Sequence, residues 1–193
     1  MLAVQTPSEP LLLDASATSS EEAGLVRETL AGDGQAFERL VRMHSPRLFR
    51  FLYQLTRSRE DAEDVAQQTF VKAYRHLHRF DPERPFIHWL LTIGRRTALN
   101  HFRAAKKSEP FTEEAPSSDP TPAENAEFRD QSENLWRRAQ SILPRRDFEI
   151  MWLRFGEDLS IEDTARVAGL TRTYVKVIVF RARRALLKAI ATP

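Results

Sequence analysis

The stretch that decides the fold of the carboxy-terminal half is SIEDTARVAGLTRTYVKVIVFRARR, residues 160–184. Ser160 is a preferred residue at the start of a helix, and the residues after it have helical spacing. Gly169 supplies a turn, because glycine adopts the backbone conformations that tight turns require. Thr171 is placed to begin a second helix, and apolar residues six and nine positions after the glycine would lock that helix against the first. The stretch therefore predicts two short helices that cross closely.

This arrangement is typical of a helix-turn-helix, whose second helix enters the major groove of duplex DNA with its N-terminal residues leading. Arg172, Thr173 and Lys176 would then reach base edges and phosphates. The arginines further along the helix would hold phosphates. The alternative is a helical hairpin that only packs against the rest of the protein.

The composition of the whole chain favours an all-α protein, since the 193 residues include only six glycines and many strong helix formers. There is no cysteine, which excludes disulfides and cysteine-based zinc sites and fits a reducing cytoplasm. No signal peptide and no apolar run of membrane-spanning length is visible. We therefore expect a cytoplasmic protein with no membrane insertion.

The net charge is only +2, but the charges are segregated along the chain. Residues 95–107 and 172–188 contain basic residues and no acid, whereas acids predominate over residues 109–133. Two basic faces separated by an acidic strip suggest a polyanion that is contacted at two places. Ordinary solvated helix surfaces are the alternative explanation.

Apolar periodicity and proline content divide the chain into four parts. We expect a disordered tail over residues 1–18, a helical domain over 19–107, a flexible acidic linker over 108–127 and a second helical domain over 128–193. In the first domain, residues 32–34 should end a short helix. Pro46 would kink or restart the next helix, and Gly94 would permit close packing or a bend in the last.

The segment after residue 57 predicts a further helix in the first domain. Ser58 is a candidate N-cap with Asp61 as its capping-box partner, and acids near the start suit the positive end of the helix dipole. The apolar residues that we expect to face inward are Val65, Phe70, Val71 and Tyr74.

Three motifs in combination resemble the extracytoplasmic-function (ECF) group of bacterial sigma-70 family sigma factors. They are DAEDVAQQTF from residue 61, the aromatic-rich pattern FDP…F…WL…I…R…ALNHFR from residue 80, and the stretch from LPRRDF at residue 143 through the helix-turn-helix. The resemblance covers residues 32–187 apart from the linker. It implies an all-α fold with two small helical domains, a region 2 type bundle and a region 4 type helix-turn-helix. It also implies that the protein binds core RNA polymerase and directs promoter recognition and transcription initiation.

In such proteins the helix that begins near residue 61 docks on the β′ clamp helices, and the second domain meets the β flap. The acids and amides would steer and contact basic groups of the polymerase. Capping alone also accounts for Asp61, and Gln68 stands where the family more often has Glu. A metal site is disfavoured, because helical spacing scatters these acids and no nearby histidine completes a ligand set. The expected polymerase-binding residues are Asp61, Glu63, Asp64, Gln67 and Gln68.

The aromatic-rich motif resembles the segment that opens and reads the −10 promoter element. Aromatic rings offer flat surfaces to unstacked bases, polar side chains bond base edges, and arginines hold phosphates. The alternatives are that Trp89 belongs to the core and that Phe80 and Phe86 only pin the loop. The expected −10 residues are Phe80, Asp81, Arg84, Phe86, Trp89, Arg95, Arg96, Asn100 and Arg103.

The helix-turn-helix resembles the part that reads the −35 element. Val177, Ile178 and Phe180 replace residues that are usually more polar in the family. Either Val177 and Phe180 contact thymine methyl groups, or readout rests more on Arg172, Thr173 and Lys176. The expected −35 residues are Arg172, Thr173, Lys176, Val177, Phe180, Arg181, Arg183 and Arg184.

No catalytic residue, cofactor or metal is expected. Separating about ten base-pair steps costs on the order of 14 kcal/mol. The chain has no nucleotide-hydrolysis motif, so this energy must come largely from binding with a larger partner. The resemblance also implies an anti-sigma factor. The alternatives are a helix-turn-helix regulator that binds duplex DNA without polymerase, and a metal-dependent nuclease that uses the acids after Ser58.

Overall fold

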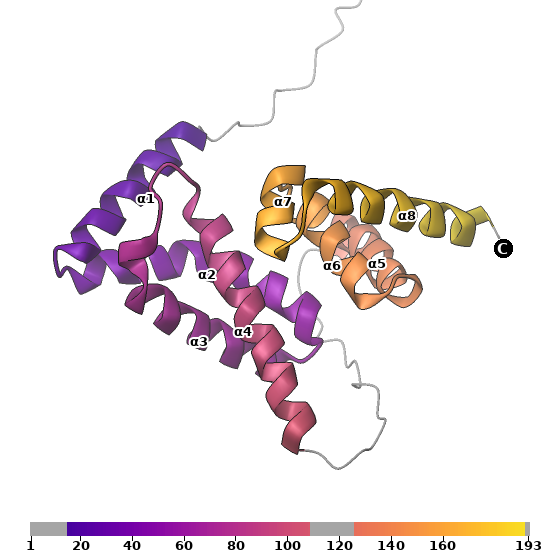
Figure 1. The fold of residues 1–193 in the computed structure, drawn as a ribbon, viewed down its shortest axis with the longest axis horizontal. Coiled ribbons are helices and arrows are strands. Elements are labelled where there is room, and N and C mark those ends of the chain that lie inside the picture. Colours follow the sequence, from indigo (N-terminus) through magenta and orange to yellow (C-terminus); the bar gives the residue numbers. More distant parts are fainter. Residues whose placement is uncertain (1–14, 109–125, 192–193) are drawn as a thin grey trace, which may run out of the picture.

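The computed structural model describes residues 15–108 and 126–191, and within these ranges the chain forms helices and no strand (Figure 1). The expectation of an all-α fold is confirmed. None of the described helices is apolar over a length that could cross a membrane. The amino-terminal group consists of α1 (Ala15–Leu30), α2 (Gly34–Thr56), α3 (Arg59–Arg75), the 3₁₀ helix η1 (Leu77–Arg79) and α4 (Phe86–Ser108).

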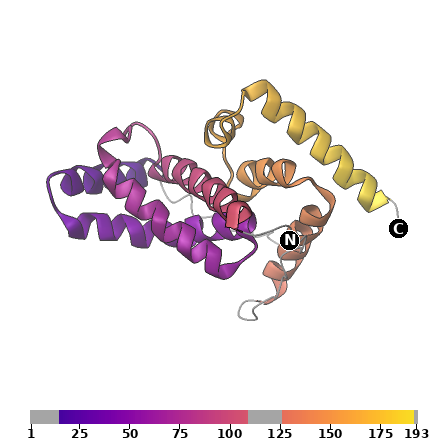
Figure 2. The same cartoon turned by 60° about the horizontal axis from the view of Figure 1, so that its bottom comes forward.

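The carboxy-terminal group contains the helix-turn-helix, with α8 as its long outer helix (Figure 2). Its elements are α5 (Ala126–Ile142), α6 (Arg145–Met151), the π-helix η2 (Trp152–Gly156), α7 (Ile161–Ala168) and α8 (Arg172–Ala191). The two groups touch, since α4 packs against α7.

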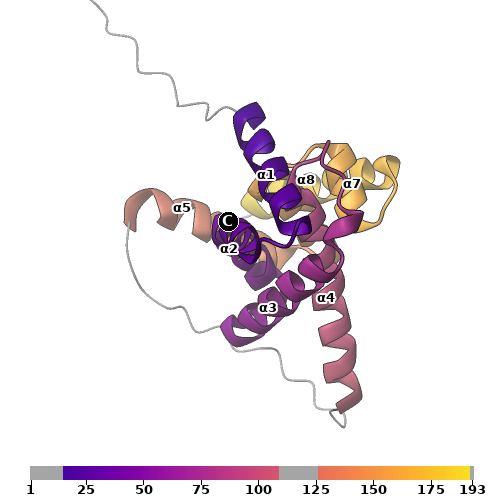
Figure 3. The same cartoon turned by 90° about the vertical axis from the view of Figure 1, so that its left-hand side faces the viewer.

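Helix α2 lies at the centre of the amino-terminal group and packs against α1, α3 and α4 (Figure 3). Leu48 and Leu52 of α2 are fully buried. Gly94 of α4 lies so close to them that a Cβ atom at this position would be 3.0 Å from Cδ1 of Leu48. Of the two roles expected for Gly94, close helix packing is therefore the one that the structure supports.

The helix ends follow local sequence signals. Asp33 caps α2 by accepting a hydrogen bond from the backbone N–H of Gln35 at 2.8 Å. Ser58 caps α3 by accepting from the N–H of Asp61, which confirms the predicted cap. Pro46 lies inside α2 and does not divide it, so the expected restart is wrong.

The predicted helix-turn-helix is confirmed by its internal contacts. Ser160 accepts from the N–H of Asp163 at 3.0 Å, and Gly169 ends α7 with a φ of 66°. Thr171 Oγ1 accepts from the N–H of Tyr174 at 3.2 Å and so caps α8. Val175 is fully buried where the two helices meet.

Two further expectations about the amino-terminal half are wrong. Val71 and Tyr74 are 45% and 53% exposed, because no described helix covers that side of α3. Helix α1 begins at Ala15, so residues 15–18 are helical and not a disordered tail. The rest of the predicted tail, residues 1–14, and most of the predicted linker, residues 109–125, lie outside the described part of the chain.

Candidate functional site

The acids and amides of α3 form an exposed surface. Glu63, Asp64, Gln67 and Gln68 are all exposed, and Glu63 pairs with Arg59 at 2.9 Å. These side chains offer hydrogen-bond acceptors and negative charge to a basic partner.

Asp61 differs from the other members of this set. Its Oδ1 lies 2.9 Å from Nε2 of His101 on α4, and its side chain is only 38% exposed. Asp61 therefore helps to hold α3 against α4, in addition to any contact with a partner.

An apolar groove of about 1020 Å³ lies between α2 and α3, beside these acids and amides. Glu63 and Gln67 line its edge, so the groove and the polar surface are continuous. Sequence reasoning missed it because Val71 and Tyr74 were assigned to the core. The apolar groove is lined by Phe37, Val41, Phe49, Phe70, Val71 and Tyr74, among others.

A cluster of aromatic rings lies at the base of the loop between η1 and α4. The ring centroid of Phe80 is 5.3 Å from that of Phe86 and 5.4 Å from that of Trp89. Phe80 and Trp89 are partly buried, but Phe86 has no exposed surface. The expectation that Phe86 stacks on unpaired bases is therefore wrong for this conformation. It pins the loop, because it is the first residue of α4 and its ring faces the core beside His44 at 5.2 Å.

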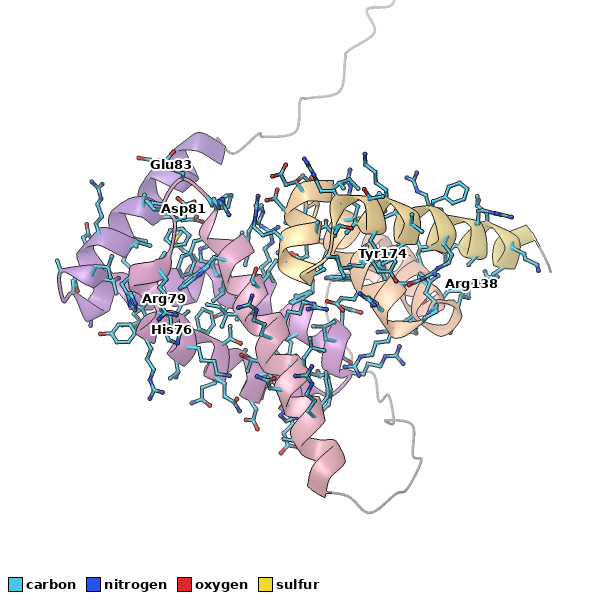
Figure 4. All side chains as sticks on the ribbon, viewed as in Figure 1. His76, Arg79, Asp81, Glu83, Arg138 and Tyr174 are labelled. Atoms are coloured by element: carbon cyan, nitrogen blue, oxygen red, sulfur yellow. The ribbon has the colours of Figure 1, made fainter. Side chains whose placement is uncertain are left out.

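The polar residues of this loop point away from the cluster. Asp81 and Arg84 are exposed and form an ion pair at 3.0 Å, and Asp81 also accepts from the N–H of Glu83 at 3.1 Å. Figure 4 shows Asp81 and Glu83 on the outer side of this loop, near α1. The ion pair holds two of the predicted base-contacting groups together at the loop surface.

The residues of α4 that were predicted to hold phosphates, Arg95, Arg96 and Arg103, and the predicted base-edge residue Asn100 fall into two classes. Arg96, Asn100 and Arg103 are exposed. Arg95 is instead only 17% exposed, and its guanidinium donates to the carboxylate of Glu149 on α6. In this arrangement of the two halves, Arg95 does not face a ligand.

Helix α8 presents most of its predicted residues to solvent. Val177 and Phe180 are 50% and 64% exposed, so both are available for apolar contacts. The guanidinium of Arg183 lies 5.2 Å from the ring of Phe155, and that of Arg184 lies 5.9 Å from the ring of Phe180. Arg172, Thr173 and Lys176 of the predicted set are also exposed.

Arg181 has a structural partner. Its Nε and Nη2 atoms donate to the two carboxylate oxygens of Asp147 on α6, at 2.9 and 2.7 Å. Asp147 is buried, and its hydrogen bonds and charge raise the pKa of Arg181. Arg181 thus sets the position of α8 on α6. The guanidinium of Arg146 lies over the ring of Tyr174, near the start of the same helix, at 5.1 Å from the ring centroid.

A metal site is not apparent in the described ranges, 15–108 and 126–191, which hold no cluster of three or more histidines and acids placed to bind an ion. The exposed residues described above form three surfaces. One surface is acidic and partly apolar on α2 and α3, and two others are basic, on α4 and α8.

Comparison with known proteins agrees with this arrangement. The sigma-70 region 2 profile matches residues 40–108, and the sigma-70 region 4 profile matches residues 141–188. The RNA polymerase sigma-H factor of Pseudomonas aeruginosa is 32% identical over 184 residues, covering 90% of this chain and 95% of that protein. The ECF RNA polymerase sigma-E factor of Haemophilus influenzae is 31% identical over 174 residues, covering 84% of this chain and 91% of that protein.

A solved structure of CnrH, in complex with the cytosolic domain of CnrY, has a TM-score of 0.64 and 26% identity. It covers 89% of this chain and 97% of that one. A regulator with a helix-turn-helix alone would not match the region 2 profile over α2, α3 and α4, so the alternative that acts without polymerase is not favoured. The chain belongs to the sigma-70 family of RNA polymerase sigma factors, in its ECF group.

Proposed function

We propose that this sigma factor works through three surfaces with separate tasks. The acids and amides of α3, with the neighbouring apolar groove, dock on core RNA polymerase. The loop after η1 and the exposed face of α4 bind the opened −10 strand. The start of α8 reads the −35 duplex. The division of the chain into two helical domains follows this division of tasks, with the expected bounds 19–107 and 128–193 extended to the helix starts at Ala15 and Ala126.

The observation that carries the proposal is the sorting of charge onto different helices. The exposed side chains at 63, 64, 67 and 68 on α3 are acids and amides, whereas Arg172 and Lys176 are exposed at the start of α8. A polyanion and a basic protein partner can therefore be bound at the same time without competing for one surface.

We further propose that an anti-sigma protein restrains this chain. The CnrH structure holds the cytosolic domain of CnrY, and a structure of RpoE from Bartonella quintana, 24% identical and with a TM-score of 0.65, holds the anti-sigma factor NepR. The apolar groove beside the α3 acids is a surface that such a protein would cover, because large exposed apolar side chains favour binding. We also propose that the chain acts in the cytoplasm and has no catalytic activity of its own.

Two variants test the separation of tasks. Lys176→Ala should reduce transcription from a mapped promoter by at least several-fold and leave the affinity for core polymerase unchanged, since its side chain is exposed on α8. Asp64→Lys should weaken polymerase binding and leave binding of the −35 duplex unchanged. Asp64 is preferable to Asp61, whose contact with His101 also supports the fold. Parallel losses in both assays for both variants would contradict the proposal.

A further inference from the structure

A buried carboxylate from α1 contacts the first residue of α4. Glu22 is only 6% exposed, and its Oε2 accepts a hydrogen bond from the backbone N–H of Phe86 at 3.1 Å. The two residues are 64 positions apart in the chain. Glu22 lies ahead of the region 2 match, which covers residues 40–108, whereas Phe86 lies inside it.

Helix α4 has no capping residue of its own at this end. The residues before Phe86 are Arg84 and Pro85, and neither side chain can accept a hydrogen bond from the first N–H groups of the helix. Free N–H groups at a helix start must be satisfied, and a carboxylate does so while also complementing the helix dipole. Glu22 on α1 supplies the hydrogen-bond acceptor that the residues just before α4 lack.

The second oxygen of Glu22 faces α2. Oε1 lies 3.2 Å from Nε2 of His44, an ion-pair distance without the alignment of a good hydrogen bond, and His44 is itself only 7% exposed. Burial alone would raise the pKa of Glu22. The neighbouring imidazole of His44, the N–H of Phe86 and the charge of Arg47 outweigh burial and lower the pKa. The carboxylate is therefore ionised at neutral pH and accepts a hydrogen bond from the N–H of Phe86.

The same residue anchors one end of the loop over residues 80–85. At the other end of the loop, Phe80 is held by its ring contacts with Phe86 and Trp89. If the N–H of Phe86 lost its acceptor, the ring of Phe86 would shift, and the rings stacked on it would shift as well. The polar residues between the two anchors would then lose their common orientation.

We infer that Glu22 is a positioning residue for the loop that reads the −10 element. The inference rests on the proposed function of that loop. Glu22 touches no DNA, and it acts through Phe86 by keeping Phe80, Trp89 and the loop between them in the arrangement that accepts an unpaired strand.

The test compares Glu22→Ala with Glu21→Ala in holoenzyme reconstituted with core polymerase. Glu21 is the adjacent residue on α1, is exposed, and pairs with Arg39 at 3.3 Å on the surface, so its removal is a matched control. The probe is a single-stranded oligonucleotide that carries the −10 sequence of a promoter mapped for the wild-type holoenzyme, with affinity measured by fluorescence anisotropy. Glu22→Ala should weaken binding by about fivefold to tenfold, as expected for loss of a helix cap, while Glu21→Ala should have no effect.

Two further readouts separate positioning from general damage. Affinity for core polymerase and for a −35 duplex should be unchanged in Glu22→Ala. Glu22→Gln should restore oligonucleotide binding, because the amide oxygen still accepts from Phe86, whereas Glu22→Asp should not, because its side chain is shorter. If Glu22→Ala does not fold, the comparison of the other two variants is a sufficient test: Glu22→Gln should bind the oligonucleotide more tightly than Glu22→Asp.

Three outcomes would overturn the inference: equal behaviour of Glu22→Ala and Glu21→Ala, a parallel loss in all three assays, or Asp performing as well as Gln. A wild-type chain that forms no holoenzyme, or a holoenzyme that ignores the oligonucleotide, would instead refute the proposed function.

Discussion

Arg47 on α2 donates two hydrogen bonds to Glu157 in the carboxy-terminal half. Its Nε lies 2.7 Å from the carboxylate oxygen Oε2, and its Nη2 lies 2.7 Å from the backbone carbonyl oxygen. The Glu157 side chain has no exposed surface, and its other carboxylate oxygen accepts from Nε1 of Trp152 at 3.1 Å. Arg145 strengthens the same junction by donating to the carbonyl of Leu55 at 3.0 Å. The two halves are thus joined by charged groups that are partly withdrawn from water.

Replacement of Arg47 by alanine should shift the chain toward separated halves. The free energy that holds the two halves together should fall by about 1–2 kcal/mol. This is less than the loss for a fully buried ion pair, because the Arg47 side chain is 37% exposed. The chain has no cysteine, so Gln68→Cys and Leu187→Cys would accept a dye pair specifically. Energy transfer should fall in Arg47→Ala and stay unchanged in Arg42→Ala, which removes only an exposed pair with Glu38. Equal transfer in both variants would show that the junction does not hold the halves together.

Arg181 and Arg184 should respond differently to truncation, although both are basic residues of α8. Arg181→Met leaves the buried Asp147 carboxylate unpaired, so the protein should unfold at a lower temperature and bind the −35 duplex less well. Arg184→Ala should not change the unfolding temperature, and should reduce the salt dependence of DNA binding by about one unit of slope. Calorimetry and a salt titration of duplex affinity measure the two effects. Identical profiles would contradict the structural role of Arg181.

Two glycines in helices should show opposite effects of added side chains. Gly94→Val should destabilise the protein by about 1–3 kcal/mol, since a Cβ atom at this position would lie only 3.0 Å from Cδ1 of Leu48. Gly24→Ala on α1 should stabilise it by about 0.5–1 kcal/mol, because a Cβ atom there meets nothing within 4 Å. Urea unfolding measures both changes. Loss of stability in Gly24→Ala would indicate a contact that this structure does not contain.

His88 on α4 should make stability depend on pH. Burial lowers the pKa of His88 and outweighs the opposing charge of Asp163, which lies 3.5 Å away, while Arg47 and Arg166 lower it further. The unfolded chain then binds the proton more strongly, so this contribution to stability is present above the usual value of 6.5 and is lost as the pH falls through the lowered pKa. The free energy of unfolding should therefore decrease between pH 7.5 and pH 5. His88→Gln should flatten the decrease, and an unchanged slope would argue against this origin.

Local signals in the sequence predicted the helix ends well. Ser58, Ser160, Thr171 and Gly169 act through residues at most a few positions away, so composition and spacing were sufficient to identify them. The phase of the helix-turn-helix was predicted for the same reason. The site residues proposed for polymerase and DNA stay predictions, although their exposure is now known.

The features that were missed depend on contacts between distant segments. Periodicity indicated that Val71 and Tyr74 share a face of α3, but it could not show that no other described helix covers that face. The sequence alone indicates a phosphate contact for Arg95, but in the fold α6 places Glu149 beside it. The pairing of Glu22 with Phe86 depends on how α1 lies against the loop over residues 80–85, and no residue close in sequence to either partner indicates it.

The location of Glu22 on α1 bears on the design of chimeras between members of this family. A chimera joined at residue 40, where the match to the region 2 profile begins, would carry a foreign residue in the place of Glu22. Exchangeable units of this protein should instead start ahead of Ala15, so that the promoter-opening segment travels together with the helix that supports it.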